Sequence, residues 1–393
     1  AVTPWQIEDG SGNPVEATGD EQVELFRSVK AGNGRVEIAL TDGGTLSAAQ
    51  VNDLSVAGTA NCYVVSAPGT YVFNARVRGN GAGEGVGFEP AIEMADGMTA
   101  DWLWTDSEGL VSGVALDTTS GDIFLTVGEG RGNALVALMQ DGKVVWSWHV
   151  WVTDAPQTMT YGNGTVFMDR NLGAAGTTAG GTDAYGMYYQ WGRKDPFYGG
   201  EKTETSANAF LEAKNGTVVN PAYPALDWAF SKSATTTDGA AANPMTFYND
   251  KVGTGYNWLA SPNATLWGEA KTLNDPCPPG YRVPGTGAWE DLISGRQYID
   301  GVSVWDGTNY GMTYTHGGQT AWYPAQGYRN YSSGAIVGLR SSTGGSGAYW
   351  SAETSSVKSY YLFFRSKLSS SGSINNELDM NRSYGYTVRC CKE

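Results

Sequence analysis

The 393-residue chain has no run of about 18 consecutive apolar residues, the shortest length that spans a bilayer as a helix. Its first residues show no basic stretch followed by an apolar one, so we expect that any export signal has been removed or never existed. Clusters of Lys and Arg, which attract a phosphate backbone, are missing as well. From these absences we predict that the chain does not span a membrane and does not bind nucleic acid.

Motifs for metals and cofactors are equally scarce. The chain has two His and four Cys, with no Cys-x-x-Cys pair, so we expect no zinc site. It contains neither the G-x-x-x-x-G-K-[ST] phosphate loop nor the G-x-S-x-G nucleophile turn. The glycines of residues 79–87 do not fit the dinucleotide fingerprint and predict a flexible turn. The sequence therefore predicts no cofactor and no metal.

Charged residues are few and unevenly distributed. They make up 17% of the chain, against about 25% in ordinary soluble domains, whereas aromatic residues reach 12%. Residues 1–155 contain 21 acidic and 7 basic residues, a net charge of −14, and residues 156–393 contain 19 and 18, a net charge of −1. The shift predicts two domains, 1–155 and 156–393, with a boundary near 154–157. The stretch 154–164 combines Pro, Gly and polar residues, so we expect proteases to cut there. We interpret the acidic excess as a solvated surface, with calcium binding or charge steering as the alternative.

The first half has the pattern of short strands. Residues 144–152 alternate apolar side chains on both faces, which predicts a central strand covered on both sides, with one face formed by Val144, Trp146, Trp148, Val150 and Val152. Asp141-Gly142 is a hairpin signal that joins it to Asn133–Met139. Further strands are expected at 62–65, 70–73 and 122–127. Many short strands with such turns predict an immunoglobulin-like β-sandwich.

The second half predicts an α+β domain with long polar loops. One short helix is expected over 183–192. A second is expected from Thr286, as its N-cap, through Trp289, Leu292 and Ile293, with Gly295 as its stop. Aromatic segments predict strands at 321–323, 349–351, 360–365 and 384–390.

Five ordered motifs in residues 160–393 give this half a specific resemblance. They are Phe167–Gly173 with Tyr188–Arg193, Asp275–Pro284 ahead of Trp289, Pro324–Arg329, Tyr349–Ala352 and Ser383–Cys390. Together they resemble the Fibrobacter succinogenes major paralogous domain. Residues 132–149 resemble the sandwich module that precedes this domain in fimbrillin-like surface proteins of gut Bacteroidetes. The resemblance implies a C-type-lectin-like fold, related to that of formylglycine-generating enzymes, and display on the cell surface, often as a pilus-tip or adhesin subunit.

The cysteines are consistent with that resemblance, which implies a disulfide between Cys277 and Cys390. Two buried free thiols are the alternative. Cys391 departs from the family pattern, and because neighbours on a strand point to opposite faces, only one of Cys390 and Cys391 should reach Cys277. Cys62 is expected to be a buried apolar residue of the first domain.

An enzyme is the less favoured class. The two histidines, His149 and His316, fall in different halves, and His149 is expected to be a packed histidine among tryptophans. The formylglycine-generating relatives need a reactive cysteine pair, and the only close pair here is Cys390-Cys391. A pair of glycosidase carboxylates is not excluded, but nothing in the sequence selects one. We therefore predict no enzymatic activity.

Binding is the favoured class, because sugar sites stack rings on Trp and Tyr beside polar groups. The Gly-rich segment Ser303–Tyr314 is expected to be an exposed loop whose ligand-binding residues are Trp305, Asp306, Asn309 and Tyr310. The alternative is a set of core aromatics beneath a long loop. The calcium-binding motifs of lectins are missing from the second half. The loop Lys367–Asn381, with Glu377 and Asp379, is interpreted as solvated, with cation binding as the alternative.

The sequence thus predicts a cell-surface or pilus-tip adhesin, exported to the cell surface, outer membrane or fimbrium. Its expected partners are a glycan or surface-protein ligand and other pilus subunits. The alternatives are a structural pilus subunit whose lectin-like domain only assembles or caps the fibre, and an enzyme on a formylglycine-generating-like fold.

Overall fold

The computed structural model describes residues 51–81, 90–199, 217–339, 345–366 and 374–393, together with the backbone of three short strands earlier in the chain. Those three strands form one antiparallel sheet in the order β1 (Ile7–Glu8), β3 (Thr45–Ala48) and β2 (Val36–Ala39). Most of the turn predicted over 79–87 lies outside the described residues.

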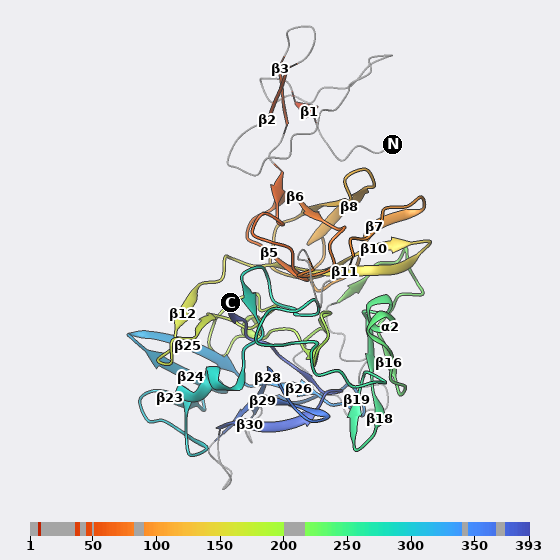
Figure 1. The fold of residues 1–393 in the computed structure, drawn as a ribbon. Helices are drawn as coiled ribbons and strands as arrows, with labels where there is room; N and C mark the ends of the chain where they lie inside the picture. The colour runs from red at the N-terminus through yellow and green to blue at the C-terminus, as the bar shows by residue number, and fades with distance from the viewer. Residues whose placement is uncertain are drawn as a thin grey trace.

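Two sheets form a β-sandwich that comes from the first half of the chain except for one strand (Figure 1). The first has the order β15 (Val218–Val219), β7 (Met98–Thr105), β10 (Gly132–Gln140), β11 (Lys143–Val152) and β5 (Cys62–Val65). The second has the order β4 (Asn52–Asp53), β6 (Gly69–Asn74), β9 (Asp122–Val127) and β8 (Val111–Asp117). Strands predicted at 62–65, 70–73 and 122–127 are confirmed as β5, β6 and β9.

The hairpin predicted from Asp141-Gly142 is also confirmed. β10 and β11 pair antiparallel, and Asp141 and Gly142 have φ values of 51° and 74°. Two successive residues with positive φ make the primed turn whose twist matches that of the paired strands.

Strand β11 is buried on both faces, as its alternation predicts. Trp146, Trp148 and Val150 pack inside the sandwich. Val144 was expected beside them but joins the cluster on the opposite face. The cause is a bulge, because Leu138 pairs with Trp146 while the next residue of β10 already pairs with Val144.

The regular elements of the second half are mostly strands. Its main sheet has the order β14 (Tyr189–Gln190), β31 (Gly385–Tyr386), β26 (Gln326–Arg329), β28 (Ser346–Ser355), β29 (Lys358–Arg365) and β30 (Ile374–Asn381), with β27 (Ile336–Leu339) paired to β26. A second sheet contains β12 (Thr158–Thr160), β13 (Val166–Met168), β32 (Cys391–Lys392) and β20 (Tyr281–Arg282). A third contains β23 (Ser303–Asp306), β24 (Gly311–His316) and β25 (Gln319–Pro324).

Three two-stranded sheets complete the described strands of this half. They are β16 (Ala229–Ser231) with β17 (Thr246–Tyr248), β18 (Asp250–Val252) with β19 (Gly255–Asn257), and β21 (Ile293–Ser294) with β22 (Gln297–Tyr298). The strands predicted at 321–323, 349–351 and 360–365 are confirmed within β25, β28 and β29. The strand predicted over 384–390 is wrong in extent, because only the two residues of β31 are strand there.

Helices are shorter than predicted. Residues 183–192 do not form a helix; the 3₁₀ turn η1 (Thr182–Ala184) ends before Tyr185, and β14 follows. The second predicted helix exists as the 3₁₀ helix η2 (Thr286–Leu292), but Gly285 stands at its N-cap. Thr286 instead donates its hydroxyl to Glu353. The helix α2 (Thr237–Ala242) was not predicted, and among the described residues no helix is long and apolar enough to cross a membrane.

The two halves share one hydrophobic core. Strand β15 comes from the second half and extends the first sandwich sheet by pairing with β7. The rings of Trp104 and Trp228 lie 5.3 Å apart across the two halves. Trp151, fully buried on β11, donates its indole N–H to the carbonyl of Ala174 at 2.9 Å. The outer face of this sheet is therefore an internal interface.

Buried polar groups also bridge the halves. Lys194 donates from Nζ to Oγ of Ser147 on β11 at 2.6 Å and lies 2.5 Å from Oδ1 of Asp195. Ser147 donates to the same carboxylate oxygen at 2.7 Å. Burial lowers the pKa of Lys194 from its ordinary value, while the adjacent Asp195 opposes that shift. The Ser147 hydroxyl therefore hydrogen-bonds to both members of the buried Lys194–Asp195 ion pair, and this network connects the second half to β11.

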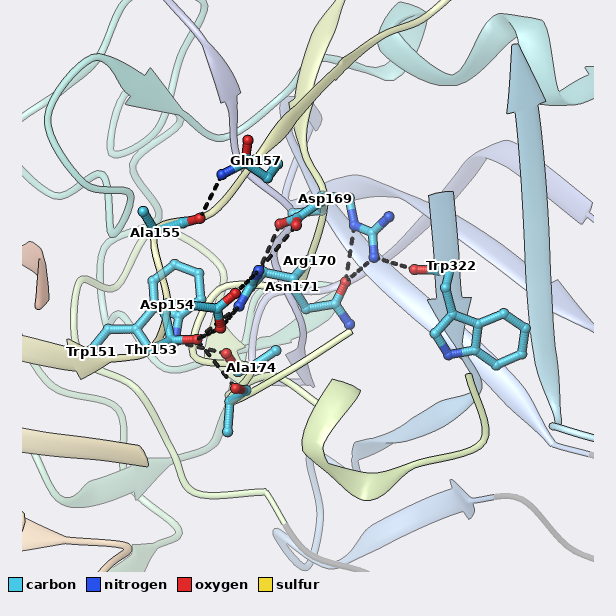
Figure 2. A network of polar contacts seen from close by, with 12 residues as sticks. Trp151, Thr153, Asp154, Ala155, Gln157, Asp169, Arg170, Asn171, Ala174 and Trp322 are labelled. Atoms are coloured by element: carbon cyan, nitrogen blue, oxygen red, sulfur yellow. Dashed lines mark hydrogen bonds and ion pairs between the residues drawn. The ribbon is translucent and has the colours of Figure 1, made fainter. Parts of the chain in front are cut away.

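The stretch 154–164 is exposed at most of its positions but is anchored to the second half. It contains β12, which pairs with β13, and Tyr161 is buried. Figure 2 shows Arg170 between the carboxylates of Asp154 and Asp169, with Arg170 donating to both oxygens of Asp154 at 2.9 and 3.1 Å. The Pro and Gly residues that suggested proteolytic cleavage lie in a segment held by strand pairing and by this ion pair. The boundary near 155 itself stays a prediction.

Candidate functional site

The predicted ligand-binding segment 303–314 is a β-hairpin, and the prediction of a loop is wrong over most of its length. β23 and β24 pair from Ser303↔Tyr314 to Asp306↔Gly311, which leaves residues 307–310 as the only loop. The segment contains a period-2 pattern that its glycines obscured, since Ser303 and Tyr314 are buried while Val304 is exposed. Gly311 is required by packing, because a Cβ there would lie 2.4 Å from the ring of Trp322.

Asp306 and Asn309 come together at the tip of this hairpin. Oδ1 of Asp306 accepts hydrogen bonds from the backbone N–H of Thr308 and Asn309 at 2.8 and 3.0 Å, and Oδ2 accepts from Nδ2 of Asn309 at 2.7 Å. Partial burial would raise the pKa of Asp306, but these bonds outweigh it and lower the pKa. Both side chains therefore stabilise the turn, and Tyr310, with φ of 55°, completes it.

Trp305 and Tyr310 are both half-buried. The ring of Trp305 packs against the buried cluster that the third sheet shares with β13, η2, β28 and β29, with its centroid 6.5 Å from that of Phe364 on β29. The sequence left two predictions open for Trp305, an exposed ring or a core ring. One part of the ring packs against the core and another part is exposed. The structure brings the four predicted residues together within one hairpin, and their role in binding stays a prediction.

The motif residues that carry the resemblance bind mainly to one another. Asn171 donates to Oε1 of Gln326 at 2.9 Å and to the hydroxyl of Tyr349 at 3.1 Å, and it accepts from Arg389 at 2.9 Å. Figure 2 shows Asn171 with the guanidinium that also donates to the carbonyl of Trp322. All four motif side chains are fully buried or nearly so. In this protein they hold the core of the second half and form no surface site.

The disulfide Cys277–Cys390 is confirmed, at a sequence separation of 113. Of the two adjacent cysteines it is therefore Cys390 that pairs. Cys391 is a buried free thiol whose pKa burial raises to about 11. Cys62, in the shared core, is buried and free as expected, and burial raises its pKa.

His149 is a buried, hydrogen-bonded histidine on β11, as predicted. Its Nε2 lies 2.8 Å from Oδ1 of Asn133, and its Nδ1 lies 3.3 Å from the hydroxyl of Tyr189. Burial lowers its pKa from 6.5 to about 3, so the ring is neutral at physiological pH. His316 lies exposed on β24, far along the chain and in a different sheet.

The predicted loop 367–381 is largely strand. Residues 374–381 form β30, on which Asp379 pairs with Lys358 at 3.1 Å and Glu377 is exposed. Residues 367–373 lie outside the described part of the chain. Within the described ranges no group of three or more His, Cys, Asp or Glu side chains is placed to hold a metal ion.

A second cluster of aromatic side chains was not predicted. Tyr256, Tyr328, Tyr331 and Tyr384, named here the tyrosine cluster, are all half-buried and come from three distant segments. Their rings form a chain, with centroids 4.6 Å apart for Tyr256 and Tyr331, 4.9 Å for Tyr331 and Tyr384, and 5.7 Å for Tyr384 and Tyr328. The only sequence signal is local, a Tyr on each side of Arg329-Asn330, because tertiary folding brings the other two rings.

The chain matches no protein-family model and no curated protein, and its structure matches no solved structure.

Proposed function

We propose that this chain is an exported binding protein of the adhesin type, displayed at the cell surface, whose second half presents a hairpin to a glycan or protein ligand. The observation that carries the proposal is an arrangement in space. The hairpin β23–β24 lies at the end of the molecule away from the sheet β4-β6-β9-β8, so the sandwich can act as a support for it (Figure 1).

Three further observations support this proposal. The Cys277–Cys390 disulfide is typical of proteins that leave the reducing cytosol. The shared core and the buried Lys194–Asp195 pair keep the two halves from moving independently, so the hairpin is held before a ligand arrives. The sequence resemblance to surface adhesins is consistent with export and with a hairpin held in place for a ligand.

The test is a binding screen of the full chain against immobilised oligosaccharides and extracellular glycoproteins. Trp305→Ala should weaken binding to the identified ligand by about tenfold or more, the usual cost of truncating an aromatic anchor. Val304→Ala is the matched control, since Val304 is exposed on the opposite face of the same strand, and should bind as the wild type does.

Two outcomes contradict the proposal. A chain that binds nothing in the screen but assembles into fibres is a structural subunit. A chain whose binding is equally reduced by both substitutions does not use the Trp305 ring.

A further inference from the structure

A short glycine-rich loop of the second half lies against the tip of the hairpin β23–β24. Residues 176–183 (GTTAGGTD), named here the Gly180 loop, lie between Ala174 and Ala184, which are both buried. Within the loop, residues 177–179 are exposed. The loop therefore leaves the core and returns to it beside the proposed ligand-binding hairpin.

The Gly180 loop is closed on itself. The N–H of Gly176 donates to the carbonyl of Asp183 at 2.8 Å, and the N–H of Gly181 donates to the carbonyl of Thr178 at 3.0 Å. The carboxylate of Asp183 packs against Gly176 and Gly181, where a Cβ would overlap it. Short surface loops whose ends meet in this way often carry the binding residues of a protein. These contacts give the loop its shape before a ligand arrives.

Gly180 brings the loop to the hairpin. A Cβ at this position would lie 2.5 Å from Oδ1 of Asn309 and 3.2 Å from its Cγ, and φ of Gly180 is 78°. Only glycine combines that backbone conformation with so close a contact. The Asn309 amide meanwhile donates from Nδ2 to Asp306. The two ends of this amide therefore face two parts of the chain, the turn of the hairpin and the Gly180 loop.

The ring of Trp305 reaches the same tip of the hairpin. A Cβ at Gly307 would lie 3.7 Å from Nε1 of Trp305, which is an ordinary van der Waals distance. Gly307 and Thr308 are exposed. Contacts thus lead from the Trp305 ring to the exposed turn, from the turn to Asn309, and from Asn309 to the Gly180 loop.

The polar residues of the hairpin tip are already engaged with each other. Asp306 accepts from the side chain and the backbone of Asn309, so these two groups are used within the turn. The polar groups that orient a ligand beside the Trp305 ring must then come from a neighbouring segment. The exposed Thr177 and Thr178 of the Gly180 loop supply hydroxyl groups, each of which is both a donor and an acceptor.

We propose that the Gly180 loop is the second wall of the hairpin's ligand-binding surface, with Gly180 and Asn309 as the residues that position it. The ring of Trp305 supplies the apolar contact, and the loop supplies the hydrogen-bonding groups. The affinity of the hairpin for its ligand then depends on how closely the loop approaches Asn309. The inference rests on the proposed function, that the hairpin binds a ligand, and adds the positioning of that site.

The first test is Gly180→Ala in the full chain, screened against immobilised oligosaccharides and extracellular glycoproteins. The added methyl group collides with Asn309 and moves the loop away from the hairpin. Affinity for each probe that the wild type binds should therefore fall about tenfold or more. Gly301→Ala is the matched control, because φ of Gly301 is 76° and a Cβ there would have nothing within 4 Å. It brings the same backbone strain without the collision, and it should bind as the wild type does.

Hydrogen exchange of the wild-type chain tests the loop without any substitution. It is measured with and without an oligosaccharide or glycoprotein that the screen has identified. Amide exchange should slow severalfold in residues 177–183 as well as in residues 307–310, because both segments contact the ligand. Circular dichroism shows whether Gly180→Ala is folded, and the exchange experiment decides if it is not.

Four outcomes are distinguished. Slower exchange in the hairpin alone overturns the inference, and so does a folded Gly180→Ala variant that binds as the wild type does; the proposed function stands in both cases if Trp305→Ala loses binding. Equal losses in Gly180→Ala and Gly301→Ala overturn the inference as well, because backbone strain is then the cause. A chain that binds no probe overturns both the inference and the proposed function.

Discussion

The interior of the sandwich and the interior of the second half differ in the types of side chain that they bury. Between the two sandwich sheets Trp148, Leu138 and Val150 belong to a hydrophobic cluster, and among the described residues of the first half no Lys or Arg is buried. The second half instead buries guanidinium groups, among them Arg329 and Arg389.

Each of these cations is held by carbonyls and aromatic rings. Arg329 donates to the carbonyls of Tyr198 and Gly334, with the Tyr198 ring 4.3 Å away. Arg389 lies 3.7 Å above the ring of Tyr323. The comparison teaches that a loop-rich fold with few regular elements uses long donor side chains to satisfy backbone carbonyls that no helix or sheet pairs.

The largest expected effect comes from the disulfide. The bridge closes a loop of 113 residues in the second half, so the double variant Cys277→Ala/Cys390→Ala should lose about 4–5 kcal/mol of unfolding free energy. Because the halves share a core, both should unfold in one transition, measured by chemical denaturation with circular dichroism. Cys391→Ala, which leaves the bridge intact, is the control. If the sandwich of the double variant unfolds in a separate transition, at the denaturant concentration of the wild type, the shared core does not couple the two halves.

Arg389→Met tests the buried cation directly. The substitution keeps the volume roughly but leaves the acceptors on Asn171 and Trp322 without a donor, at about 1–3 kcal/mol for each. In the sandwich, Leu138→Met also changes a fully buried side chain but should cost less than about 1.5 kcal/mol. Thermal unfolding compares the two. Equal losses of stability in the two variants would show that the buried guanidinium contributes no more to folding than an apolar core side chain does.

His149 probes the interface between the two interiors through its pH dependence. The unfolded ring takes up a proton near its ordinary pKa of 6.5, but the native ring does so only near 3. Between these values the unfolded state binds more protons, so lowering the pH destabilises the fold by about 1.4 kcal/mol per pH unit. His149→Gln should remove that slope from urea midpoints, whereas His316→Gln, an exposed site, should leave it. If the pH dependence of stability is unchanged in His149→Gln, a group other than His149 takes up the proton on unfolding.

Trp305→Ala should cost less stability than the loss of the disulfide or of the Arg389 guanidinium. A fully buried Trp costs roughly 3–5 kcal/mol on truncation, and the partly exposed ring of Trp305 should cost less than that. The loss should appear as a modest fall in melting temperature. A fall as large as that of Trp289→Ala, at a fully buried position, would make Trp305 a core residue and remove it from the binding surface.

Regular strands were predictable wherever a period of two met a clear turn. The β10–β11 hairpin follows from alternating apolar residues and Asp141-Gly142. The 303–316 hairpin was missed, because Gly307 and Gly311 resemble loop glycines although the latter is set by contact with Trp322. The candidate residues Trp305, Asp306, Asn309 and Tyr310 were named from composition alone, whereas the tyrosine cluster needed three segments to meet.

The sequence by itself determined the β-rich class, the faces of β11 apart from its bulge, the buried state of His149 and, through its resemblance, the Cys277–Cys390 pair. These depend on local alternation and on which residue types are present. Only the tertiary structure decided that the outer face of the sandwich is an interface, that 154–164 is strand-paired, and that Asn171 and Arg389 bind each other. The physical reason is that hydrogen bonds between residues more than two hundred positions apart, as in that last pair, leave no periodic signal in either segment.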